Sequence, residues 1–308
     1  MEVAQITGFQ IIQLIVMMAV GFIGFKAKII TKEGNKLLSK MILYIFTPVV
    51  LFVSYQKPFS MQLLSDLGIC FLLSILIFVV SFIFAYFTVV RKKRKNFEIE
   101  EIEIVFSNCG FVGIPLAAAL FGDYGILYVT AFITVFNLVL WTYGISIFSG
   151  KFSKKQFFKA FVNPCLIAVF LGFLFFIFQI KLPNLLLAPL QSVSNAYVPL
   201  AMIIIGCSLA QASFVDLFKN KRVFLISFYR LIAIPIIYII VCIPLRSLVN
   251  EDILLVMYIA ALCPAAATGP MFSEIYDKDT VYASSIVCLT TIFSAITIPA
   301  IMYLQSMI

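Results

Sequence analysis

Long runs of apolar residues, separated by short polar stretches, fill almost the whole chain. A helix that crosses a bilayer needs about 20 largely apolar residues. By this rule the pattern predicts ten membrane spans, and the short connections leave no room for a soluble domain. The expected spans cover residues 7–25, 36–55, 63–90, 99–122, 124–148, 161–180, 189–212, 222–245, 251–275 and 279–305.

The fourth and ninth expected spans are interrupted by residues that break helices. Residues 106–116 read FSNCGFVGIPL, and the ninth span carries CPAAATGP over residues 263–270. Pro and Gly disfavour a helix interior, and non-helical backbone at membrane depth must be buried in protein or line a water-filled cavity. The pattern therefore predicts two pairs of half-helices. The second members would start near Leu116 and Met271 and direct their positive ends toward a gap near the midplane.

Composition agrees with an integral membrane protein, because 63% of the 308 residues are hydrophobic and only 12% are charged. A soluble protein needs a more polar outer face. The opening MEVAQITGFQ has one acid and no base, so the first run is expected to be a retained helix rather than a signal peptide. His is absent and the seven Cys form no C-x-x-C pair. This excludes a His-ligated metal or haem, and we expect no cofactor; the Cys are interpreted as small buried residues.

Charge in the loops predicts the orientation. Odd-numbered loops hold 18 Lys and Arg and even-numbered loops hold 3. Because basic loops stay in the cytoplasm, both termini are expected outside a multi-pass protein of the cell membrane. The net charge of +8 then faces anionic inner-leaflet lipids, with no need for nucleic acid. RKKRK at 91–95 is interpreted as a topology anchor, although a partner or specific lipid is an alternative.

Two sets of charged residues are interpreted as solvated. The acids at positions 98, 100, 101 and 103 follow RKKRK and are expected to offset it on a solvated face. Arg230 lies in the eighth span, about seven residues from its cytoplasmic end, from where its side chain could extend back to water. We therefore do not expect Arg230 to bind a ligand.

Ten spans with both termini outside can be two sets of five, and the second set is then inverted. The expected second and seventh spans carry Pro48 and Pro199, and the fourth and ninth carry Pro115 and Pro270. Matched interruptions in two halves indicate a transporter site. We predict a first five-helix repeat over residues 1–150 and a second, inverted one over 151–308.

At these residues a family resemblance is visible. SNCGFVGIPLAAALFGDYG resembles the fourth helix of the auxin efflux carrier family, which includes plant PIN carriers and bacterial malate and malonate permeases. Asn108, Gly113, Pro115 and Leu116 match the family pattern. ALCPAAATGPMFSEIYDKD resembles the ninth helix, where Pro264, Ala265, Phe272 and Glu274 fit. The resemblance implies an all-α transporter with crossed, broken helices four and nine, similar to bile-acid symporters and sodium–proton antiporters.

The resemblance further implies a secondary active transporter that moves a small organic anion by alternating access. The long cytoplasmic loop of many PIN proteins is missing, and so is their Asn-Thr motif, so an organic acid is favoured over auxin. Catalytic clusters and Walker motifs are absent, which disfavours an enzyme and direct use of ATP. A sodium-coupled symporter or cation–proton antiporter of the same fold, and a transport-dead sensor, stay open.

The predicted carboxylate site lies between the two interruptions, where backbone N–H groups and half-helix ends would hold the anion. Proton or Na⁺ coupling is open, with Asp66 and Glu274 as candidates, each alternatively a solvated helix end. Asn108 is alternatively only a cap of the broken helix, and a homodimer is also open. The predicted binding residues are Asn108, Gly110, Gly113, Ile114, Pro115, Pro264, Thr268, Gly269 and Pro270.

Overall fold

The computed structural model describes residues 2–92, 95–150, 162–211 and 220–305. Two features of the sequence fall partly outside these ranges. Residues 93–94, in the middle of RKKRK, are not described. The predicted boundary between the two repeats falls between residues 150 and 151. Residues 151–161, directly after it, also lie outside the described part.

All regular elements of the described residues are helices. Up to residue 150 they are α1 (Glu2–Lys26), α2 (Lys32–Met41), η1 (Ile42–Phe46), α3 (Thr47–Ser54), α4 (Met61–Thr88), η2 (Val90–Lys92), α5 (Phe97–Val105), η3 (Cys109–Gly113), α6 (Ile114–Val139), η4 (Leu140–Gly144) and α7 (Ile145–Ser149). After it they are α9 (Pro164–Ile177), α10 (Asn184–Asn195), α11 (Tyr197–Gln211), α13 (Lys221–Phe228), η5 (Tyr229–Ala233), α14 (Ile234–Cys242), η6 (Ile243–Leu245), α15 (Glu251–Leu262), α16 (Thr268–Ile275) and α17 (Thr280–Gln305).

Several of these helices are suited to a membrane. Within the described residues, six helical stretches are long and apolar enough to cross a bilayer, and two shorter apolar helices accompany them. The shorter ones are Ile12–Lys26 and Pro164–Ile177. The chain is thus an all-helical, multi-pass membrane protein, whereas the full ten-helix arrangement remains a prediction. The long stretches are Lys32–Ser54, Met61–Lys92, Cys109–Ser149, Asn184–Gln211, Lys221–Leu245 and Thr280–Gln305.

Three intramembrane prolines follow a widened helical turn. The residue before each of them, Thr47, Ile114 or Ile234, donates its N–H to the carbonyl five positions earlier. Proline lacks an N–H, and its ring clashes with the carbonyl four residues before it in a regular helix. One widened, π-type turn moves that carbonyl away from the proline ring. The helices η1, η3 and η5 therefore let their spans continue through a proline.

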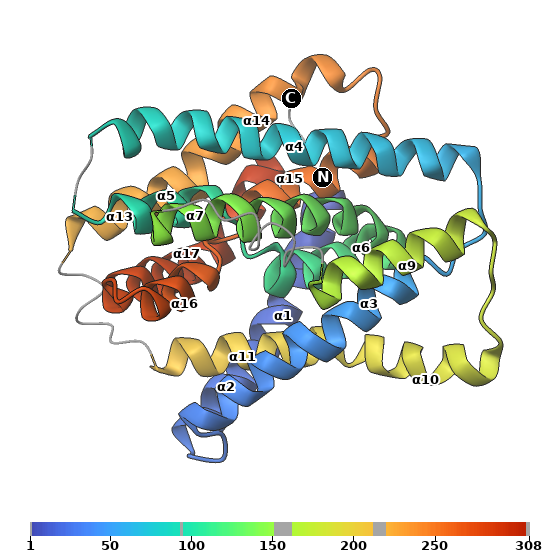
Figure 1. Cartoon of the computed structure of the whole chain (residues 1–308), viewed down its shortest axis with the longest axis horizontal. Helices are drawn as coiled ribbons and strands as arrows, with labels where there is room; N and C mark the ends of the chain where they lie inside the picture. Colours follow the sequence, from blue (N-terminus) through green and yellow to red (C-terminus); the bar gives the residue numbers. More distant parts are fainter. Residues whose placement is uncertain (1, 93–94, 151–161, 212–219, 306–308) are drawn as a thin grey trace.

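The helices form two bundles. The first bundle contains α1, α2, α3, α9, α10 and α11, in which α1 packs on α11 and α3 packs on α9 and α10. The second bundle contains α4 to α7 and α13 to α17, in which α6 packs on α4 and α15, and α17 packs on α13 and α16. Figure 1 shows α4 along one edge of the molecule and the α10–α11 pair along the opposite edge. Each bundle therefore takes helices from both halves of the sequence.

The two bundles meet mainly at α6. This helix contacts α1, α3, α9 and α11 of the first bundle, and α1 also contacts α17. Gly122 of α6 has a φ of 58° and separates a short first part from a longer second part. A residue with a side chain rarely adopts this left-handed conformation. The glycine thus marks the bend between the predicted fourth and fifth spans.

Two glycines allow the closest helix contact of the first bundle. A Cβ added to Gly206 of α11 would overlap the carbonyl oxygen of Met18 in α1, and one added to Gly21 would overlap the carbonyl oxygen of Ile203. Cys207 also donates its thiol to the Gly21 carbonyl, with 3.2 Å between Sγ and O. Small residues commonly permit such close backbone approach between membrane helices.

We expect Gly206→Ala to destabilise the protein by about 1–3 kcal/mol, the usual cost of overpacking, because the new methyl group meets backbone. Gly68→Ala is the matched control, since a Cβ at this position of α4 meets nothing within 4 Å. The measurement is the melting temperature of the detergent-solubilised protein, followed by size-exclusion chromatography after heating. Equal melting temperatures for the two variants would contradict the close contact of α1 and α11.

Candidate functional site

The two interruptions predicted from the sequence lie side by side and are hydrogen-bonded to each other. α5 ends at Val105 and α15 ends at Leu262, and the residues that follow pair in an antiparallel bridge between Ser107 and Ala265. The Asn108 N–H donates to the Pro264 carbonyl at 2.7 Å, and the Ala266 N–H donates to the Phe106 carbonyl at 3.0 Å. Each break thus satisfies backbone groups of the other, as burial in an apolar environment requires.

Asn108 begins the helical turn after the first break. Its side chain is 8% exposed, and Oδ1 accepts the Phe111 N–H at 3.4 Å. It is therefore a helix cap, which is the simpler of the two roles considered for it. The helical turn η3 starts at Cys109, seven residues before the predicted Leu116, because the widened turn accommodates Pro115. A contact of Asn108 with substrate stays a prediction.

Two contacts of the first break involve Gly110 and Gly113. Tyr197 of α11 donates its hydroxyl to the Gly110 carbonyl at 2.6 Å, which ties the break to the first bundle. A Cβ on Gly113 would overlap Sγ of Cys109 and lie 3.2 Å from Sγ of Cys263 in the second break. Gly113 thus lets the two breaks pack together. Ile114 and Pro115 follow, both buried, as the first residues of α6.

The second break places four predicted residues around the start of α16. Pro264 is buried and paired with the first break, while Thr268, Gly269 and Pro270 form the first turn of α16. This helix begins three residues before the predicted Met271. No side chain caps its N-terminus, where Ala267 stands at the cap position. The Thr268 hydroxyl is buried and has no hydrogen-bond partner among the described residues.

Arg230 lies at the centre of this arrangement, and the expectation that it reaches back to water is wrong. Its side chain is 0% exposed. Nη1 donates to the Ile104 carbonyl at 3.1 Å, Nη2 to the Ala261 carbonyl at 2.7 Å and Nε to the Cys263 carbonyl at 3.0 Å. One guanidinium therefore joins the carboxyl-terminal ends of α5 and α15, where carbonyls lack helical partners and carry partial negative charge.

The acids after RKKRK also contradict the expectation of a solvated face. Glu100, Glu101 and Glu103 are all buried. Glu100 accepts two hydrogen bonds from Arg222, at 2.7 and 2.6 Å, and one from the Tyr282 hydroxyl at 2.8 Å. Helix packing, not loop charge, pairs Glu100, because α5 contacts both α13 and α17. Glu98 pairs with Lys278 at 3.2 Å.

Glu103 lies at the second break and was missed by the sequence analysis. It is 0% exposed, and neither carboxyl oxygen has a hydrogen-bond partner among the described residues. A Cβ on Gly269 would overlap its Oε1, so the carboxyl group rests directly on the first turn of α16. An available signal was the presence of four acids, at positions 98, 100, 101 and 103, in a stretch whose other residues are apolar.

The two predicted coupling residues have different environments. Asp66 is buried in α4 and accepts hydrogen bonds from Gln62 at 2.8 Å and from the Tyr128 hydroxyl at 3.3 Å. Glu274 is exposed, as a solvated helix end would be. Neither residue is hydrogen-bonded to the breaks. A role of either residue in coupling stays a prediction.

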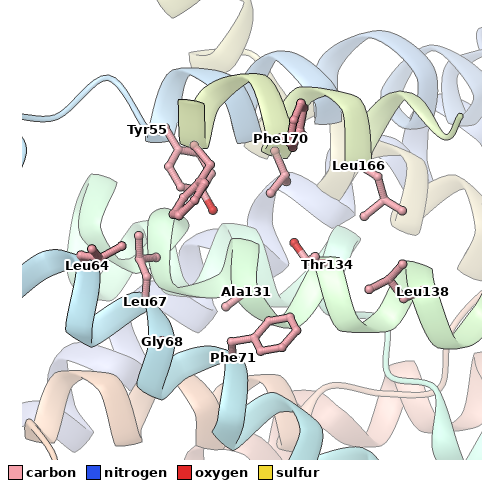
Figure 2. A pocket seen from close by; sticks show the side chains of 12 residues that line it. Tyr55, Leu64, Leu67, Gly68, Phe71, Ala131, Thr134, Leu138, Leu166 and Phe170 are labelled. Atoms are coloured by element: carbon pink, nitrogen blue, oxygen red, sulfur yellow. The ribbon is translucent and has the colours of Figure 1, made fainter. Parts of the chain in front are cut away.

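Two cavities lie where the bundles meet. The larger, of about 450 Å³, lies between α9 of the first bundle and α4 and α6 of the second. Figure 2 shows that leucine, phenylalanine and alanine side chains dominate its walls, with Tyr55 and Thr134 as polar groups. A carboxylate would find no charged partner there. A second cavity of about 200 Å³, beside α6, has polar walls that include Ser54, Asp123, Gln191, Ser194 and Asn195.

In the described part of the chain, no three His, Cys, Asp or Glu side chains come together. The polar groups near the breaks include Arg230, the unpaired acid Glu103, Asn108, Thr268 and backbone dipoles. Buried charges on broken helices are characteristic of proteins that move solutes across membranes.

The apolar helices and paired breaks thus define a polytopic membrane transport protein. A family model described as membrane transport protein matches residues 8–157 and 151–302. The chain belongs to this family, that of the auxin efflux carriers. It is also 25% identical over 301 residues to "Uncharacterized transporter MJ1031" of Methanocaldococcus jannaschii, covering 92% of this chain and 94% of that protein. The predicted family is confirmed.

We expect Arg230→Lys to lower the melting temperature strongly, because an ammonium group cannot reach three separate carbonyls and each buried acceptor left unpaired costs about 1–3 kcal/mol. Arg246→Lys is the control, since Arg246 lies just after the end of the same span and donates to one carbonyl, that of Gln305, at 3.0 Å. Equal losses in the two variants, measured in detergent, would show that Arg230 does not hold the breaks together.

Proposed function

We propose that this protein is a secondary active transporter that carries a small organic anion, such as a carboxylate, through the cell membrane by alternating access. The observation that carries the proposal is the hydrogen-bonded pair of helix breaks at the junction of two bundles. Matched breaks in corresponding spans are typical of transporters built from inverted repeats. The proposed architecture is accordingly ten spans in two inverted sets of five, divided near residue 150.

The charges around the breaks favour an anion. Arg230 brings a full positive charge to the ends of α5 and α15. The starts of η3 and α16 add partial positive charge, roughly half an elementary charge per helix. Backbone N–H groups at such ends bind carboxylates well. Because each nitrogen of Arg230 already donates to a carbonyl, we assign it an electrostatic and positioning role, with direct contacts left to Asn108 and the backbone of the two first turns.

Few polar contacts connect the bundles at the breaks, which suits alternating access. At the first break, Tyr197 holds the Gly110 carbonyl. Away from the breaks, α6 is bonded to the first bundle through Lys57–Asp123 at 2.6 Å, Tyr55–Thr130 at 2.8 Å and Asn163–Asn137 at 3.2 Å. Within the second bundle, by contrast, Arg222, Glu100 and Tyr282 join α5, α13 and α17. We infer that the second bundle moves as one body against the first and carries the substrate with it.

The membrane orientation is part of the proposal. We expect residue 95 in the cytoplasm and residue 181 outside, because basic residues concentrate in the odd-numbered loops. In intact cells, Lys95→Cys should be labelled by a membrane-permeant maleimide only, and Lys181→Cys, exposed at the other predicted face, by an impermeant one too. Labelling of Lys95→Cys by the impermeant reagent would overturn the orientation.

Substrate binding at the first break is tested by uptake of radiolabelled acetate, lactate and malate into proteoliposomes. Asn108→Ala should reduce the apparent affinity about tenfold or more, since a hydrogen bond to a charged group contributes about 1.5–3 kcal/mol. Asn108→Asp should be worse, because an ionised side chain repels the anion.

The control for loss of a helix cap is Asn250→Ala. The Asn250 side chain accepts the Asp252 N–H at the start of α15, away from the breaks. Wild-type affinity in both Asn108 variants would place the substrate elsewhere. Absence of uptake of all three acids by the wild-type protein would contradict the proposed substrate class, and uptake of Na⁺ or release of protons alone would favour a cation transporter of the same fold.

A further inference from the structure

We propose that Glu103, facing the first turn of α16, is the proton-binding site that couples anion transport to protons. The inference rests on the proposed function, and it adds the coupling ion and the residue that carries it. The sequence pointed instead to Asp66 and Glu274, which lie outside the breaks.

The geometry singles out Glu103 among the acids of α5. Glu98 and Glu100 are paired with Lys278 and Arg222, and Glu101 accepts the Tyr143 hydroxyl. Glu103 alone of these four has no hydrogen-bond partner at either oxygen among the described residues. A buried carboxyl group without partners is costly in its ionised form. A group of this kind exchanges a proton when its surroundings change, rather than serving as a fixed structural ion.

The start of α16 forms the other half of the site. Gly269 has no side chain, and its Cα therefore lies directly against the carboxyl group of Glu103. The N-terminus of α16 has no side-chain cap, and the neighbouring Thr268 hydroxyl also lacks a partner among the described residues. An unpaired carboxyl group thus points at an uncapped helix end, where the dipole favours negative charge.

The site is close to the surface at one point. Ala267 is exposed and Thr268 is half-buried, whereas Gly269 and Glu103 behind them are buried. A small shift of the first turn of α16 would therefore admit water to the carboxyl group. A proton could then enter from one side of the membrane and leave toward the other as the second bundle moves.

The charges that face this site favour a proton over a metal cation. Arg230, from η5, acts on Glu103 electrostatically while its three nitrogens donate to carbonyls. Together with the positive end of α16 it would repel a second cation such as Na⁺, which also needs several oxygen ligands. A proton needs one oxygen and removes the negative charge without adding a bound ion.

Other ionisable groups on the elements around α5 are neutral, already hydrogen-bonded or exposed. From α17, the Cys288 thiol is near enough for Glu103 to act on it electrostatically, and Tyr282 is bonded to Glu100. From α13, Arg222 is bonded to Glu100 as well. Lys221 of α13, Glu274 of α16, Tyr86 of α4, Tyr303 of α17, and Arg91 and Lys92 of η2 are exposed. Asp66 of α4 is bonded to Gln62 and Tyr128, Cys70 of α4 is buried, and Tyr229 of η5 is half-buried. Titration of the site is therefore assigned to Glu103.

Coupling follows from charge balance at the breaks. With Glu103 ionised, its negative charge offsets that of Arg230, and a substrate anion gains little. A hydronium ion that gives one proton to a Glu103 oxygen forms an O–H bond and leaves water, so the breaks become net positive. Proton binding then strengthens anion binding, and by thermodynamic reciprocity anion binding strengthens proton binding. The result is proton–anion symport.

The first experiment needs no substrate. Infrared difference spectra of the purified full-length protein, recorded across a pH titration, report the carbonyl stretch of protonated carboxyl groups. We expect a titrating band that is lost in Glu103→Gln, shifted in frequency in Glu103→Asp, and unchanged in Glu98→Gln, the control on the same helix. An unchanged band in Glu103→Gln, or its loss in Asp66→Asn instead, would overturn the assignment. If Glu103→Gln fails to fold, the shift in Glu103→Asp decides alone.

The second experiment measures coupling in proteoliposomes, with whichever of acetate, lactate and malate the wild-type protein takes up. An inward proton gradient should drive accumulation by the wild type and by Glu98→Gln. Glu103→Gln should retain exchange of labelled for unlabelled acid but lose gradient-driven accumulation. Accumulation by Glu103→Gln at the wild-type level would refute the proposal. A wild type that takes up none of the acids would contradict the proposed function, and the infrared titration would still decide whether Glu103 binds the proton.

Discussion

The structure depends on how two interrupted helices satisfy their backbone groups inside an apolar interior. A break in a membrane helix exposes N–H and C=O groups, and each unpaired group costs free energy because no lipid can bind it. Here the two breaks pair backbone groups with each other, through the Ser107–Ala265 bridge and the hydrogen bonds beside it. Arg230 completes the arrangement by donating to carbonyls of both breaks. Its buried charge is tolerated because three acceptors and two helix dipoles surround it.

This arrangement determines where charge can change. Arg230 is fully engaged and the guanidinium stays protonated under ordinary conditions, so it contributes a constant positive charge. Glu100 is equally engaged with Arg222 and Tyr282. Glu103, on the same helix as Glu100, has neither a hydrogen-bond partner among the described residues nor exposure to solvent. The constant charge of Arg230 and the variable charge of Glu103 therefore lie close together at the breaks. Binding of one ion can then change the binding of another.

The same packing separates rigid from adjustable contacts. The first bundle is held by direct backbone contact of α1 and α11, which Gly21 and Gly206 permit. The second bundle is held by the breaks and by the Arg222–Glu100 ion pair. Between the bundles, α6 meets α1, α3, α9 and α11 across surfaces that include two cavities. The cavities at this junction leave room for the movement of whole bundles that we propose.

The sequence alone determined the membrane class, the family and the positions of the two breaks, because these depend on local composition: apolar runs, and Pro and Gly within them. It also indicated Asn108 and the glycines, which share one short motif. It could not place Arg230 or Glu103. Their roles depend on residues about 30 to 170 positions away, such as Ile104, Cys263 and Gly269. A charged residue in an apolar run can extend to water or be buried with partners, and only the packing of α5 against α13, α16 and α17 decided between them.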